Sequence, residues 1–134
     1  MKVKGVLLKF DVPNVNHSVI SKDCKIDIPD KVPIVNEFNM WNYPMRQCRS
    51  IGFANVSRTN EGLIFEGDVI SPYSEIISER IKNNKTAGAG GYYNKVKKDE
   101  KGLITEMTLR AVCYVNAPVN PDYKFEIVEE SEEK

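Results

Sequence analysis

Two strand-turn-strand patterns, separated by one helical pattern, constrain the fold of this chain more than any other feature. β-forming residues flank a Thr-Asn-Glu-Gly turn that ends at Gly62, and similar turn chemistry returns forty residues later at Gly102. Glycine adopts the positive φ that a tight reversal requires. The sequence therefore predicts two β-hairpins, over residues 49–70 and 96–116.

A single helix is predicted between the hairpins, over residues 71–82. Ser71 suits the N-cap and Pro72 the first helical position, while Asn83 favours termination. The apolar face at helical spacing comprises Tyr73, Ile76, Ile77 and Ile81. Charged residues fall towards the opposite face, as expected for a helix packed on a sheet.

Prolines divide the remaining β-forming sequence. Residues 3–10 predict a first strand, and Pro29 and Pro33 make residues 25–36 suited to short edge strands. The predicted fold is a β-dominated α+β domain, a small, partly closed β-barrel with one packed helix. We expect residues 1–128 to form this single domain and residues 129–134 (EESEEK) to be an acidic, disordered tail.

Composition excludes several classes of partner. The chain has 134 residues, with 19 basic and 19 acidic side chains, so no global field attracts nucleic acid or an anionic membrane. No apolar stretch approaches the roughly 18 residues that span a bilayer. We therefore expect a cytoplasmic protein with neither nucleic acid nor a membrane as partner.

The sequence predicts neither a metal centre nor a cofactor. Cys24, Cys48 and Cys113 are an odd number at wide spacing and are predicted to be reduced core residues. The one histidine, His17, lies in a loop pattern without ligand partners.

Several segments, in order, resemble the prohead (capsid maturation) protease superfamily of tailed phages, whose fold is shared with the herpesvirus assemblins. The matching segments are residues 10–20 (FDVPNVNHSVI), 33–38 (PIVNEF), 51–56 (IGFANV), 62–67 (GLIFEG), 104–109 (ITEMTL) and 117–121 (APVNP). The resemblance covers roughly residues 5–125. It implies a prohead protease/assemblin-like fold.

The catalytic positions of that family are not matched. Asn36 and Glu37 stand on the strand that usually presents the histidine, and Ala89 or a neighbouring glycine stands where the family has its serine. A serine nucleophile needs a neighbouring base at neutral pH. The resemblance therefore implies a pseudoenzyme: a non-enzymatic auxiliary or decoration subunit that binds the major capsid protein or another head protein. It would be present in the host cytoplasm during assembly and then in the virion head.

Two other functions stay open at this point. An active prohead serine protease could use relocated residues, with His17 near Ser50, Ser57 or Ser74, or a Ser/Lys pair. A transient head-assembly or scaffold factor would leave before maturation. A homo-oligomer is compatible with each of these functions.

Three segments are candidates for partner binding. Residues 38–45 are rich in aromatic and methionine side chains, and predict either a docking loop or a lid over one barrel end. Its candidate contact residues are Phe38, Met40, Trp41, Tyr43 and Met45. Residues 87–91 (AGAGG) predict either an edge that accepts another strand or a closely packed strand.

The third segment is a basic run on the second hairpin. Lys95, Lys97 and Lys98 could meet an acidic surface on a shell protein. The alternative is a solvated strand edge protected against aggregation.

Overall fold

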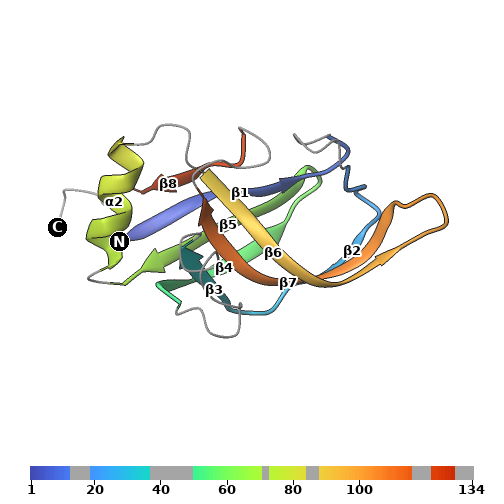
Figure 1. The fold of residues 1–134 in the computed structure, drawn as a ribbon, viewed down its shortest axis with the longest axis horizontal. Coiled ribbons are helices and arrows are strands. Elements are labelled where there is room, and N and C mark those ends of the chain that lie inside the picture. Colours follow the sequence, from blue (N-terminus) through green and yellow to red (C-terminus); the bar gives the residue numbers. More distant parts are fainter. Residues whose placement is uncertain (13–18, 37–49, 71–72, 84–87, 116–121, 129–134) are drawn as a thin grey trace.

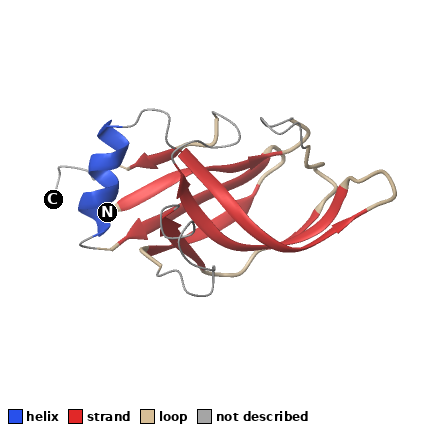
Figure 2. Ribbon diagram, viewed as in Figure 1, coloured by secondary structure: helices blue, strands red, loops and turns tan. Residues whose placement is uncertain are grey.

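The computed structural model describes residues 1–12, 19–36, 50–70, 73–83, 88–115 and 122–128 (Figure 1). Strands dominate these segments, with one helix at one end of the molecule and a long hairpin projecting at the other (Figure 2). The elements are β1 (Lys2–Lys9), β2 (Lys25–Asp27), β3 (Val32–Asn36), β4 (Gly52–Arg58), β5 (Gly62–Val69), α2 (Tyr73–Asn83), β6 (Gly88–Lys98), β7 (Ile104–Val115) and β8 (Phe125–Ile127). The β-dominated α+β prediction is confirmed.

Both predicted hairpins, β4–β5 and β6–β7, are present. The hydroxyl oxygen of Thr59 accepts hydrogen bonds from two backbone N–H groups, two and three residues further on, at 3.1 and 3.2 Å. In the second turn a carboxylate oxygen of Asp99 accepts hydrogen bonds from the backbone N–H groups two and four residues further on, at 2.8 and 3.0 Å. Gly62 and Gly102 have φ values of 156° and 83°, so each turn uses the conformational freedom that the sequence indicated.

All eight strands belong to one mixed sheet. The order is β2, β7, β3, β4, β5, β1, β8, and β6 pairs with β7. β6 pairs with β7 along most of its length. On the other side of β7, β2 and β3 pair with different parts of the strand. Both of these short strands are parallel to β7, whereas the other pairings are antiparallel.

The predicted barrel is wrong, because the sheet does not close. Among the described residues, a backbone hydrogen bond at Tyr123 links β6 to the segment that precedes β8. The carbonyl oxygen of Tyr123 accepts a hydrogen bond from the Ala89 N–H at 2.9 Å, and its phenol oxygen accepts one from the Lys9 N–H at 3.1 Å. These bonds bring the ends of the sheet together, but they do not form the continuous ladder of paired strands that closure requires.

The prediction of edge strands over residues 25–36 is half right. β2 pairs only with β7 among the described strands, but β3 lies inside the sheet between β7 and β4. Pro33 is tolerated there because its pairing partner is Phe53 on β4, while pairing with β7 begins one residue later at Ile34. The missing N–H of proline therefore costs no bond of the β7 ladder.

The helix α2 packs on the end of the sheet through one narrow stripe. Ile77 is buried, and Tyr73 and Ile81 pack against the same core at a spacing of four residues. Ile76 was expected on this face but is 47% exposed, so that part of the prediction is wrong. The apolar stripe is narrow because the helix lies at the ends of the strands rather than across the face of the sheet (Figure 1).

The centre of the core is aromatic. The Phe125 ring lies 5.5 Å from the Phe65 ring and 5.4 Å from the Tyr114 ring, measured between centroids. The Tyr114 contact is edge-to-face, an arrangement that the ring quadrupoles favour. This cluster joins β5, β7 and β8, and it lies behind the first half of β6.

Candidate functional site

Two of the three positions that differ from the protease pattern lie in one cross-strand row. On β7, Tyr114 has Ala89 of β6 as its Cα partner on one side and Asn36 of β3 on the other. The structure therefore brings together two sequence positions that the family resemblance singled out independently. Glu37 lies outside the described residues, as does His17.

Ala89 is closed to any substrate. Its exposed fraction is 0%, and its row partner Tyr114 is also fully buried. A side chain at position 89 points into the core, where a methyl group offers no nucleophile and water has no access. The row therefore offers neither a nucleophile nor an opening at Ala89.

The small residues beside Ala89 have different structural reasons. A Cβ on Gly91 would lie 2.4 Å from the Tyr93 hydroxyl oxygen, so this glycine makes room for a folded-back ring. A Cβ on Gly90 would meet nothing closer than Val115 Cγ1 at 3.7 Å. Close packing thus explains positions 89 and 91 but not position 90.

Tyr93 is a feature that the sequence reasoning missed. Its hydroxyl is buried without a hydrogen-bond partner among the described residues. Burial is the main cause that raises the pKa of this phenol far above its usual range, with smaller contributions from Tyr123, Cys113 and Cys24. No sequence signal distinguishes it from Tyr92, since the burial depends on the neighbouring glycine and on a register shift between the two tyrosines.

A β-bulge follows on the same strand and reorganises the predicted basic run. Asn94 and Lys97 are three residues apart on β6, yet their partners on β7, Thr108 and Glu106, are two apart. Lys95 lies in the extra step and has a φ of 52°, a left-handed conformation that is uncommon for a lysine. The bulge therefore places Lys97 directly opposite a carboxylate.

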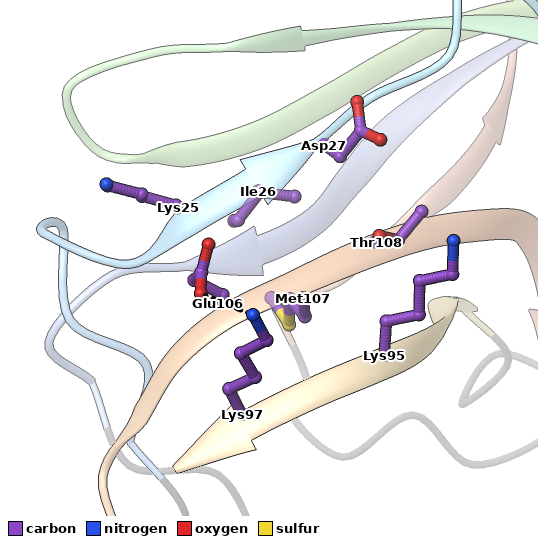
Figure 3. Close-up of a pocket in the computed structure, with 8 residues that line it drawn as sticks. All are labelled: Lys25, Ile26, Asp27, Lys95, Lys97, Glu106, Met107 and Thr108. Carbon is purple, nitrogen blue, oxygen red and sulfur yellow. Dashed lines mark ion pairs between the residues drawn. The ribbon is translucent and has the colours of Figure 1, made fainter. Parts of the chain in front are cut away.

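Glu106 is the centre of a mixed-charge groove (Figure 3). Lys97 Nζ lies 3.2 Å from its carboxylate, and Lys25 is its Cα partner on the other side, on β2. Lys95 and Asp27 also line this groove, whose volume is about 410 Å³. The floor includes apolar atoms of Ile26 and Met107.

The basic run predicted from sequence is thus divided by the structure. Lys95 and Lys97 share the groove, whereas Lys98 is exposed on the strand, opposite Ile104, and does not line it. Lys25 joins the groove from a segment seventy residues earlier, and sequence reasoning did not include it. Only the pairing of β2 with β7 reveals this neighbour.

The aromatic and methionine segment of residues 38–45 lies outside the described residues, as does Cys48. Cys24 and Cys113 are buried, as predicted for core residues, and no disulfide joins these two described cysteines. Burial raises the pKa of the Cys24 thiol, which favours its unreactive protonated form.

Among the described residues, no three His, Cys, Asp or Glu side chains are grouped so that they could hold a metal ion. The part of the chain that the structure describes also holds no helix with the length and apolar character needed to cross a bilayer. Comparison of the chain with models of known protein families, with curated proteins and with solved structures finds no match.

Proposed function

We propose that this chain is a non-enzymatic phage head protein, an auxiliary or decoration subunit that binds the major capsid protein. In this proposal its fold is an inactivated prohead protease/assemblin-like fold. The observation that carries the proposal is the burial of Ala89, at the position where the resembled family has its nucleophile. The order of the matching sequence segments supplies the phage assignment.

The chemistry of the row supports a protein without proteolytic activity. Acyl transfer by a serine requires a hydroxyl, a base within hydrogen-bond reach and access for a peptide. Ala89 has no hydroxyl and no exposed surface, and the amide of an asparagine such as Asn36 does not act as a base near neutral pH. Loss of the catalytic pair leaves intact any surface that once positioned capsid-protein chains for cleavage.

Two surfaces are assigned to binding in this proposal. One is the segment that contains Phe38, Met40, Trp41, Tyr43 and Met45, residue types that dominate binding energy at interfaces. The other is the hairpin with Lys95, Lys97 and Lys98, which is exposed at the end of the molecule away from α2 (Figure 1). Aromatic anchors supply affinity, and the lysines steer an acidic partner into register.

The first test is the copy number of this protein relative to the major capsid protein in purified mature particles, measured by quantitative mass spectrometry. A ratio near a simple fraction of the capsid subunits supports an ordered shell component. Absence from mature particles together with presence in proheads replaces the proposal with a transient assembly factor. Absence from both overturns a role in the head.

A cleavage assay with capsid and scaffold proteins tests the non-enzymatic part separately. We expect no cleavage by the wild-type chain. Cleavage that disappears when one serine is changed to alanine would overturn this part of the proposal and identify the relocated nucleophile.

A further inference from the structure

The groove around Glu106 has an excess of uncompensated positive charge. The ion pair at 3.2 Å neutralises Lys97 with Glu106, which leaves Lys25, Lys95 and Asp27 as the other charged side chains in the lining. Neither remaining lysine forms an ion pair in the part of the chain that the structure describes. The charged side chains of the lining other than this ion pair therefore carry two positive charges and one negative charge.

The groove is also shaped for an extended chain rather than for a compact ion. Its polar lining follows three adjacent strands, with Lys25 and Asp27 on β2, Glu106 and Thr108 on β7 and the lysines on β6 (Figure 3). Neighbouring strands are about 4.8 Å apart, so the lining extends for about 10 Å across the sheet. That width accommodates three or four residues of a peptide.

The chain itself contains a segment of matching chemistry. Residues 129–133 (EESEE) hold four glutamates, and they follow the last described residue, Val128. Four carboxylates on a short segment complement two free ammonium groups and the nearby Lys98. The charge of the groove therefore selects an acidic peptide, and this sequence supplies one.

The acidic segment cannot reach the groove of its own copy. The Phe125 ring contacts the Tyr114 ring, and Glu106 lies eight residues from Tyr114 along β7, about 27 Å of strand. From Phe125 the chain runs the other way, because Val128 N–H donates to the Lys2 carbonyl oxygen at 2.9 Å, near α2 (Figure 1). Five further residues extend at most about 18 Å. Any contact between segment and groove must therefore join two copies.

We propose that the groove formed by Lys25, Lys95 and Lys97 binds the acidic segment, residues 129–133, of a second copy of this chain. The contact joins two different surfaces, so it gives a two-fold dimer when two copies exchange tails reciprocally, and rings or open chains when they do not. This inference rests on the proposed function only in treating the β6–β7 hairpin as a binding surface, and it does not require a phage head. It names a second copy as the occupant of that surface.

Self-association of the purified full chain tests the inference by sedimentation velocity. The Debye length is about 30 Å at 0.01 M salt and about 3 Å at 1 M, so an ionic contact forms at the first and is lost at the second. We expect the weight-average mass to rise with concentration above the 15.2 kDa of one chain at low salt, and to return to it at high salt. A chain that stays monomeric at low salt and high concentration overturns the inference.

A charge exchange identifies the two partners of the contact. One variant carries Lys25→Glu with Lys95→Glu, and keeps Lys97 so that its ion pair survives. The other carries lysine at the four positions Glu129, Glu130, Glu132 and Glu133. We expect each variant alone to be monomeric at low salt, and an equimolar mixture to associate again because each reversed charge then meets its complement.

The matched control is Lys2→Glu with Lys4→Glu, two exposed lysines on β1 whose replacement reverses the same number of charges as the groove variant. This control should associate like the wild type, and its loss of association would indicate a general charge effect and overturn the inference. Circular dichroism and thermal unfolding establish that each variant is folded. If the groove variant fails to fold, the association of the tail variant, which alters no described residue, is sufficient to test the inference.

Failure of this test and failure of the proposed function are distinguishable. The association experiment contains no capsid protein, so a monomeric chain overturns the homotypic contact and leaves the particle copy number to decide the head role. Absence from particles, in turn, leaves the association result standing.

Discussion

The two halves of β6 differ in their exposure to solvent. The first half, which includes Ala89 and the folded-back Tyr93, packs against the core, and the second half, from Lys95 on, is exposed. One continuous strand thus holds a closed position at Ala89 and an open charged groove beside Lys95 and Lys97. The difference teaches that a sequence pattern can single out a position that folding buries, whereas exposure shows which surface is available for binding.

The largest effect that tests this comparison is expected from Ala89→Leu. The added carbons must enter a fully buried position beside Tyr114, and overpacking of this kind costs about 2–3 kcal/mol of the free energy of unfolding. Denaturant unfolding monitored by circular dichroism measures it. The matched control is Gly90→Ala on the neighbouring residue, where the new Cβ meets only Val115 Cγ1 at 3.7 Å and should cost little. Equal losses in the two variants would show that position 89 is not the closed side of the strand.

The sequence predicted the hairpins better than it predicted how the strands are arranged in space. Local turn chemistry at Gly62 and Gly102 determined both hairpins, because a turn depends on residues adjacent in the chain. The row that joins Ala89 and Asn36 through Tyr114 was not predicted, because it depends on the pairing of β7 with β3 and β6, which are distant in the chain.

The groove was beyond prediction for a physical reason. Lys25 reaches it through a parallel pairing with β7, and no local rule specifies which distant strand a three-residue segment will join. The bulge at Lys95 could not be predicted from the sequence either, because lysine is not a residue type that indicates a left-handed conformation. Sheet closure failed as a prediction for the same reason, as it depends on the spatial approach of β6 and β8.

The next effect is expected from Tyr93→Phe, which sharpens the description of the closed half. Removal of a buried hydroxyl that has no hydrogen-bond partner among the described residues should raise the free energy of unfolding by about 1 kcal/mol. Thermal and denaturant unfolding at neutral pH measure this gain. Tyr92→Phe, at a partly exposed neighbour, is the control and should change stability by less. A loss of stability in Tyr93→Phe would reveal a bond to the hydroxyl that stabilises the fold.

The same residue predicts a pH dependence. Because burial raises the pKa of Tyr93 in the folded state above the ordinary phenol value of about 10, the folded protein disfavours the phenolate. Its contribution to stability is therefore complete below about pH 10 and is lost as the pH rises towards the folded-state pKa. Unfolding curves between pH 8 and pH 11 should show a smaller loss in Tyr93→Phe than in the wild type. Parallel losses would contradict the buried assignment.

A smaller effect is expected from Lys95→Gly, at the boundary between the two halves. Glycine adopts a φ of 52° without the steric cost that lysine pays there, although it also gains entropy in the unfolded chain. We expect a net gain of about 0.5 kcal/mol in the free energy of unfolding. Lys97→Gly, at a residue beyond the bulge, is the control and should lose stability instead. If both variants lose stability equally, the bulge is not a distinct feature of the open half.

The smallest effect is expected for the ion pair in the open half. Lys97 and Glu106 are 3.2 Å apart, but their side chains are 70% and 43% exposed, so water and salt screen their attraction. A double-mutant cycle with Lys97→Ala and Glu106→Ala should give a coupling energy of at most about 0.5 kcal/mol, falling at high salt. A coupling several times larger would mean that the groove contributes to the fold as the closed half does. A small coupling leaves its charges available for a partner, because little folding energy depends on keeping them paired with each other.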